Sequence, residues 1–198
     1  MPLIDRIRPL APSAGPPARQ ARGRSGGLGR PSSDRAERVS DDLRRRISDH
    51  LTRRRRQTAL MLGATGSMGL ILLYQTGILR HLPDPPLPGL DSDKVDASGE
   101  AYQNLKTPDA ALAIASYGAT LALIAMGAAD RAKDRPVIPL LAAAKLASDA
   151  GGAAWLTAEQ ITKHRAVCFY CLLASAATWA ALPQALPEAR EAWHKLRA

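Results

Sequence analysis

The stretch from Thr58 to Leu79 contains 22 residues and no charged side chain. A helix rises about 1.5 Å per residue, so roughly 20 such residues cross the hydrocarbon core of a bilayer. Three further apolar runs follow, and the sequence predicts membrane spans at about 58–79, 110–129, 137–156 and 166–182. Within lipid, backbone polar groups must be bonded inside the segment itself. The prediction is therefore an all-α integral membrane protein, a four-transmembrane-helix bundle with a long outer loop after the first span.

The basic charge of the chain is confined to its N-terminal region. Residues 1–57 hold fifteen Arg, no Lys and six acidic side chains, which accounts for the whole net charge of +9, and the rest of the chain is balanced. This region contains no aromatic side chain on which bases could stack, so specific binding of nucleic acid is not expected. We predict a disordered Arg/Pro/Gly-rich tail at 1–33, a basic juxtamembrane helix at 34–57, the membrane domain at 58–186 and a cytoplasmic tail at 187–198.

The juxtamembrane helix is predicted from the spacing of its apolar residues. Val39, Leu43, Ile47 and Leu51 recur every four positions, which indicates one apolar face on a helix from about Asp34 to Thr52. Such a helix could lie on the anionic inner leaflet, where each Arg contributes about 1 kcal/mol, or it could bind a partner protein. The sequence leaves both interpretations open.

The orientation follows from the charges that flank the spans. Four consecutive arginines, Arg53 to Arg56, precede the first span, and the positive-inside rule places them in the cytoplasm. Both chain ends are then cytoplasmic. The loop from Arg80 to Thr107, with five acidic and three basic side chains, lies outside. The three cations at 163–165 also lie outside and mildly oppose this orientation, but the Arg cluster outweighs them.

Cys168 and Cys171 are the only cysteines of the chain, and they form a Cys-x-x-Cys pair. They fall at the outer end of the fourth predicted span, in an oxidising compartment where disulfides persist. A helix N-terminus favours a thiolate, most strongly at Cys168. We therefore expect Cys168 to face solvent and exchange with a partner, and Cys171 to lie deeper and face a ligand inside the bundle.

Two other interpretations of the cysteines remain. They could be two buried structural cysteines, which are common in apolar helices. They could also bind a metal together with His164, but a closed metal site generally needs four ligands, so we predict no metal.

Three stretches of the chain are similar to the vitamin K epoxide reductase family. They are the run from His164 to Leu173 around the cysteines, the loop from Asp91 to Ser98, and the entry to the second span from Thr107 to Tyr117. The likeness covers about residues 58–186. It implies a membrane thiol-disulfide oxidoreductase that couples oxidation of a periplasmic protein thiol to quinone reduction. The implied partners are a membrane quinone and a separate thioredoxin-like protein, and the implied location is the bacterial inner membrane.

The chain departs from this family in its outer loop. Family members usually carry a second cysteine pair there, which relays electrons to the Cys-x-x-Cys, and this chain has none. When Lys94, Val95 and Ser98 are matched to the family pattern, the later loop cysteine falls at Ser92 and the earlier one near Asp84. The resemblance therefore implies that a partner exchanges directly with Cys168.

The resemblance also suggests residues around the quinone. Ser98 falls where the family has a serine near the active site, and Asp109 falls near the polar residue that contacts the quinone carbonyl, although an amide is usual there. Tyr117 follows it in the second span. Tyr170, beside the cysteines, is expected either to anchor the span at the membrane boundary or to contact the quinone.

Lys145 and Asp149 are two charges inside the third predicted span. Spaced i, i+4, they can pair with one another, and we favour such a structural pair over a role for Asp149 as proton donor to the quinone. The alternative to an enzyme is a non-catalytic membrane protein on the same fold that binds a quinone, a lipid or a partner.

Overall fold

The computed structural model describes residues 33–198, so most of the predicted disordered tail lies outside the described residues. The chain divides into two units, residues 1–37 and 38–198, and the second contains the membrane helices. The described part is all-helical, as predicted, and contains no β-strand. Its elements are α1 (Asp34–Arg45), α2 (Asp49–Gln75), α3 (Ser92–Asp96), η1 (Gly99–Tyr102), α4 (Asp109–Ala125), α5 (Arg131–Asp134), α6 (Val137–Glu159), η2 (Gln160–His164) and α7 (Phe169–Arg197).

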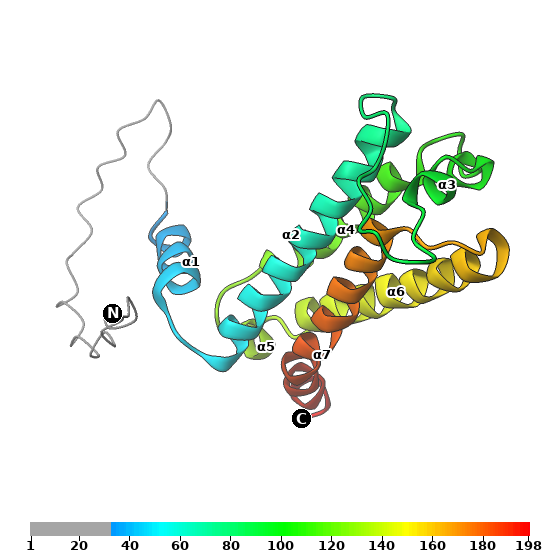
Figure 1. Ribbon diagram of the computed structural model, residues 1–198. Helices are drawn as coiled ribbons and strands as arrows, with labels where there is room; N and C mark the ends of the chain where they lie inside the picture. The colour runs from blue at the N-terminus through cyan, green and yellow to red at the C-terminus, as the bar shows by residue number, and fades with distance from the viewer. Residues whose placement is uncertain (1–32) are drawn as a thin grey trace, which may run out of the picture. The chain divides into compact units, whose positions relative to one another are not determined.

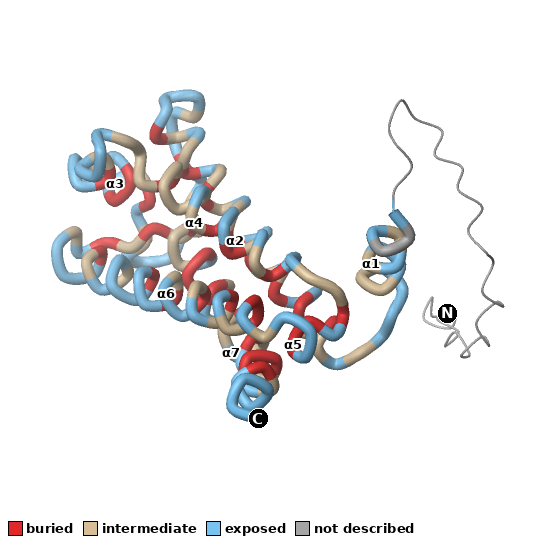
Figure 2. The backbone as a smooth tube through the Cα atoms, turned by 180° about the vertical axis from the view of Figure 1, so that it is seen from behind, coloured by how far each residue is buried: buried red, intermediate tan, exposed pale blue. Residues whose placement is uncertain are grey.

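Four helices form the bundle: α2 packs against α4 and α7, and α6 packs against α7 and α4 (Figure 1). Three helical segments are long and apolar enough to cross a membrane, Asp49–Gln75, Val137–His164 and Phe169–Arg197. The apolar helix α4 is shorter, with 17 residues. Buried positions recur along the faces that these helices turn toward one another (Figure 2). The core they form includes Met61, Ile71, Ile124 and Leu146.

Helix α4 ends at Ala125, before the predicted end of its span at residue 129. Gly127 has φ +87°, a conformation that side chains rarely adopt, and it turns the chain out of the helix. Arg54 of α2 and Arg131 of α5 donate hydrogen bonds to backbone carbonyls between residues 123 and 128. The last carbonyls of a helix lack partners within it, so the two guanidinium groups satisfy the end of α4.

Helix α7 continues through Pro183, where the fourth span was expected to stop. Proline in a helix interior removes one backbone hydrogen bond and costs about 3 kcal/mol. Packing beyond it offsets this cost, because Ala185, Glu188 and Ala192 are buried. Glu188 accepts two hydrogen bonds of 2.8 Å from the buried Arg131. The helix therefore continues to Arg197, beyond the predicted end of the fourth span at residue 182.

The juxtamembrane region also differs from the expected single helix. α1 ends at Arg45, and Ser48 starts a new helix by accepting a hydrogen bond from the Leu51 amide at 3.3 Å. Ile47, expected on the apolar face, lies in the break and is 87% exposed. Leu51 instead belongs to α2, which continues directly into the first span.

The long loop between α2 and α4 is folded onto the bundle. It holds α3 and η1, and its residues Leu82 and Val95 belong to the core. A short parallel bridge joins Leu90 to Val167, directly before the cysteine pair. Ser98 precedes η1 without the capping hydrogen bond that its hydroxyl could provide. The loop therefore fixes the surroundings of the cysteines.

Candidate functional site

The two cysteines lie at the first turn of α7. Cys168 is the N-cap residue, and its Sγ accepts a hydrogen bond from the Cys171 amide at 3.1 Å. Both are free thiols in this structure. The unpaired amides at the start of a helix favour negative charge, so this position stabilises Cys168 as a thiolate. The spacing thus places both sulfur atoms at one helix end, as expected.

Cys168 is fully buried, with 0% of its surface exposed, so the expectation that it faces solvent is wrong. Its amide donates to Gln160 Oε1 at 3.0 Å, and the next amide, of Phe169, donates to Ser92 Oγ at 3.0 Å. The bridge between Leu90 and Val167 adds a third contact. Burial thus results from the long loop packing onto the start of α7, a tertiary contact that the local pattern does not contain.

Ser92 and Asp84 occupy the positions matched to the family's loop cysteines, and they are in contact. The Ser92 hydroxyl donates to Asp84 Oδ1 at 2.6 Å, and its amide donates to Oδ2 at 2.6 Å. Ser92 is also fully buried. Hydrogen bonds therefore hold this part of the loop in place, but neither side chain can carry electrons.

A cavity of about 340 Å³ lies beside the cysteines, between the four helices and the loop. Cys171 lines it, whereas Cys168 does not, which agrees with the expectation that Cys171 faces the bundle interior. Apolar side chains such as Met68, Ile71 and Leu156 form part of the wall. The predicted site residues on the wall are Ser98, Asp109, Tyr117 and Asp149.

Tyr170 is the predicted quinone contact that does not line this cavity. Its hydroxyl donates to the Pro83 carbonyl at 2.7 Å, so it connects α7 to the long loop. The Tyr170 side chain is buried in the core, so its observed contact is with the long loop and not with the cavity.

Asp149 forms the expected ion pair with Lys145. Its carboxylate also accepts hydrogen bonds from Ser116 and Thr120 of α4. The pair therefore joins α6 to α4 inside the bundle, and both carboxylate oxygens have partners.

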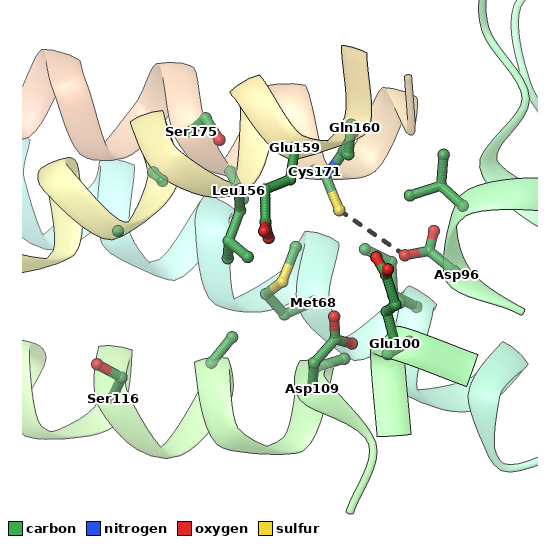
Figure 3. A pocket seen from close by; sticks show the side chains of 18 of the residues that line it. Met68, Asp96, Glu100, Asp109, Ser116, Leu156, Glu159, Gln160, Cys171 and Ser175 are labelled. Atoms are coloured by element: carbon green, nitrogen blue, oxygen red, sulfur yellow. Dashed lines mark hydrogen bonds between the residues drawn. The ribbon is translucent and has the colours of Figure 1, made fainter. Parts of the chain in front are cut away.

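Asp96 is a site residue that was not predicted from the sequence. It is 2% exposed, lines the cavity, and its Oδ1 accepts a hydrogen bond from Cys171 Sγ at 3.8 Å (Figure 3). Its Oδ2 has no hydrogen-bond partner among the described residues. Burial raises the pKa of Asp96 to about 9, and the nearby Cys168 sulfur acts in the same direction. Its carboxyl group therefore holds a proton at neutral pH.

Gln75, at the end of α2, is a second residue that was missed. Its Nε2 donates to Asp109 Oδ1 at 2.6 Å and to the Asp96 carbonyl at 3.4 Å, and its Oε1 accepts from the Ala110 amide. The side chain thus positions Asp96 and Asp109, two of the acidic residues that line the cavity. It also supplies an amide beside Asp109, near the place where the family pattern has one.

Among the residues that the structure describes, one group of side chains could contribute to a metal site: Asp96, Cys168 and Cys171. Their ligand atoms lie within 4.8 Å of one another. His164 instead lies 3.2 Å from Glu100 as an ion pair. The donors expected for a metal thus differ from those that the structure brings together, and three donors leave a closed four-ligand site incomplete.

These features define a helical membrane protein with a pair of free cysteines, of which Cys171 lines an internal cavity. Residues 57–186 match the sequence pattern of the Vitamin K epoxide reductase family, and the chain belongs to this family. Members of this family are membrane thiol oxidoreductases whose reaction is coupled to quinone. The comparison with curated proteins gave no match, and the comparison with solved structures gave none either.

Proposed function

We propose that this protein is a membrane thiol-disulfide oxidoreductase that oxidises a periplasmic protein thiol and passes the electrons to a quinone. The observation that carries the proposal is the position of Cys171, which lines an internal cavity while its amide contacts the sulfur of Cys168. A quinone in the cavity is the substrate, and the two cysteines are the electron donors.

In the proposed reaction, the reduced site gives up two protons and two electrons, and an S–S bond forms between Cys168 and Cys171. The two electrons and two protons convert the quinone to a hydroquinone. Tyr117 and the apolar wall would hold the ring, and Ser98 and Asp109 would offer polar contacts to its oxygens. A partner dithiol then reduces the disulfide and restores both thiols.

We place the cysteines at the outer face of a bacterial inner membrane, with both chain ends in the cytoplasm. The arginines that precede the first span support this orientation. The partner is a thioredoxin-like protein that attacks Cys168. Because Cys168 is buried under the long loop, exchange requires that the contacts of Leu90 and Ser92 with the start of α7 open first.

The test is quinone-dependent thiol oxidation by the full chain in membrane vesicles. Cys168→Ser and Cys171→Ser should each abolish it, because either change removes one half of the disulfide. Asp91→Asn, an exposed carboxylate in the loop, serves as the control and should keep activity. Full activity in either cysteine variant contradicts the proposal.

The second candidate is a non-catalytic binding protein on the same fold. The hydrogen-bonded Ser92 and Asp84 favour it, because they stand where the family carries its relay cysteines. A Cys171→Ala variant distinguishes the two, since its Cys168 thiolate can attack the disulfide form of a partner, release one partner thiol and remain joined to the partner as a mixed disulfide. Capture of the disulfide form of a thioredoxin-like periplasmic protein through Cys168 supports the enzyme, and quinone binding without capture or turnover supports the alternative.

A further inference from the structure

The carboxyl group of Asp96 has two oxygens in different situations. Oδ1 is hydrogen-bonded to Cys171 Sγ at 3.8 Å, whereas Oδ2 is buried without a partner among the described residues. A buried polar atom left unpaired costs roughly 1–3 kcal/mol, so its retention calls for an explanation. Asp96 also lines the cavity that we assign to the quinone.

The position of Asp96 is fixed from two sides. It ends α3, and its backbone carbonyl accepts a hydrogen bond from Gln75 of α2. Its carboxyl group has an oxygen within 4.8 Å of both cysteine sulfur atoms. Asp96 thus contacts Cys171, lies close to Cys168 and lines the cavity. A group that moves protons from the thiols to a ligand in the cavity needs this placement.

We propose that Asp96 is the catalytic acid and base that carries the cysteine protons to the quinone oxygens. This inference rests on the proposed function and adds a role to a residue that the function did not yet include.

The proton balance of the reaction follows from this assignment. At rest Asp96 holds the proton removed from Cys168, Cys168 is a thiolate and Cys171 is a thiol. Asp96 gives its proton to one quinone oxygen and then accepts the proton of Cys171 through the contact between Sγ and Oδ1. It passes this second proton to the other oxygen, while the S–S bond forms and two electrons enter the ring. Two thiols become a disulfide and one quinone becomes a hydroquinone.

The raised pKa of Asp96, about 9, supports this cycle because the resting acid is protonated at neutral pH. Several other titratable groups face it from neighbouring elements, and their charges set the pH range. They are Cys168 and Cys171 at α7, Asp109 of α4, Tyr74 of α2, and the ion pair of Glu100 and His164 at the cavity wall.

The experiment measures single-turnover quinone reduction by the pre-reduced full chain in lipid vesicles, with ubiquinone-1 as the probe. Asp96→Asn keeps the shape but cannot carry a proton, so the rate should fall about 10²-fold with little change in the quinone concentration for half-maximal rate. The wild-type rate should fall as pH rises through about 9, and this alkaline decrease should be absent in Asp96→Asn. Asp91→Asn is the matched control on the same helix, because Asn caps a helix as well as Asp does.

A second measurement does not depend on turnover. The infrared band of a protonated carboxylic acid should be present at neutral pH in the wild type and in Asp91→Asn, and absent in Asp96→Asn. The proposal is overturned if Asp96→Asn loses the band but reduces quinone at the same rate as the wild type. It is also overturned if the wild type does not show the band. If Asp96→Asn does not fold, Asp96→Glu takes its place and should keep both the band and the alkaline decrease. If the wild type shows the band but no quinone reduction, the proposed function fails, and with it the catalytic role of Asp96.

Discussion

The Ser92 hydroxyl donates a hydrogen bond of 2.6 Å to Asp84 Oδ1, and the same hydroxyl accepts one from the Phe169 amide beside Cys168. Ser92 and Asp84 stand where other family members are expected to have their loop cysteines. In this chain a hydrogen bond therefore joins the two positions, and a second one joins the loop to the start of α7, but neither side chain can form a disulfide.

The first prediction concerns a variant in which cysteines replace both of these loop residues. In an Asp84→Cys, Ser92→Cys double variant, the new thiols should form a disulfide, because the side chains they replace are already in contact. Oxidation of an added dithiol protein should rise about tenfold or more, since exchange between the thiol introduced at position 92 and Cys168 becomes intramolecular. Peptide mapping under non-reducing conditions and the rate of thiol oxidation measure the two effects. Ser92→Cys alone is the control, and a double variant that forms no disulfide between positions 84 and 92 contradicts the prediction.

The second prediction concerns the buried ion pair of Arg131 and Glu188. Both side chains are almost fully buried, so Glu188→Gln leaves Arg131 with an uncompensated charge and should lower the free energy of unfolding by about 3 kcal/mol. Unfolding in mixed detergent micelles measures it. Glu191→Gln removes partly exposed pairs from the same helix and should cost less than about 1 kcal/mol. Equal losses in the two variants would show that the buried pair has no special role in holding α7.

The third prediction distinguishes Asp149 from Asp96, since both acids line the cavity. Asp149 is already paired with Lys145 and bonded to α4, so we expect it to stabilise packing rather than transfer protons. A Lys145→Met, Asp149→Leu double variant removes both charges together and should keep the single-turnover rate within about threefold, because an ion pair can be replaced by apolar side chains at little cost. A loss of about 10²-fold, of the size expected for Asp96→Asn, would instead assign the proton transfer to Asp149.

Much of the fold could be predicted because a helix that crosses lipid must be apolar and about 20 residues long. The charge-free run from Thr58 indicated the first span, and the Cys-x-x-Cys spacing identified the start of α7. The continuation through Pro183 could not be predicted, because a proline rule describes the local backbone and not the anchoring of Glu188 by Arg131. Packing between the long loop and the bundle also accounts for the errors at the site.

The burial of Cys168 and the roles of Asp96 and Gln75 depend on contacts between residues far apart in the sequence. Asp96 is one of several acids in an acidic loop, and only the fold brings it to Cys171, 75 positions away. Its place inside the stretch that resembles the family was the one available signal. Gln75 could have been noticed as a polar side chain at the end of an apolar span.

The last prediction follows from the linkage between protonation and stability at Asp96. Burial raises its pKa in the folded protein from the ordinary value of 3.8 to about 9, so the folded state binds more protons than the unfolded state between these values. The contribution of this group to stability is therefore complete below about pH 4 and is lost as pH rises toward 9. Between about pH 6 and pH 9, the midpoint of thermal unfolding in detergent should fall by about 10 °C more in the wild type than in Asp96→Asn. Asp91→Asn should follow the wild type, and identical pH dependence in all three proteins would show that Asp96 is not a buried neutral acid.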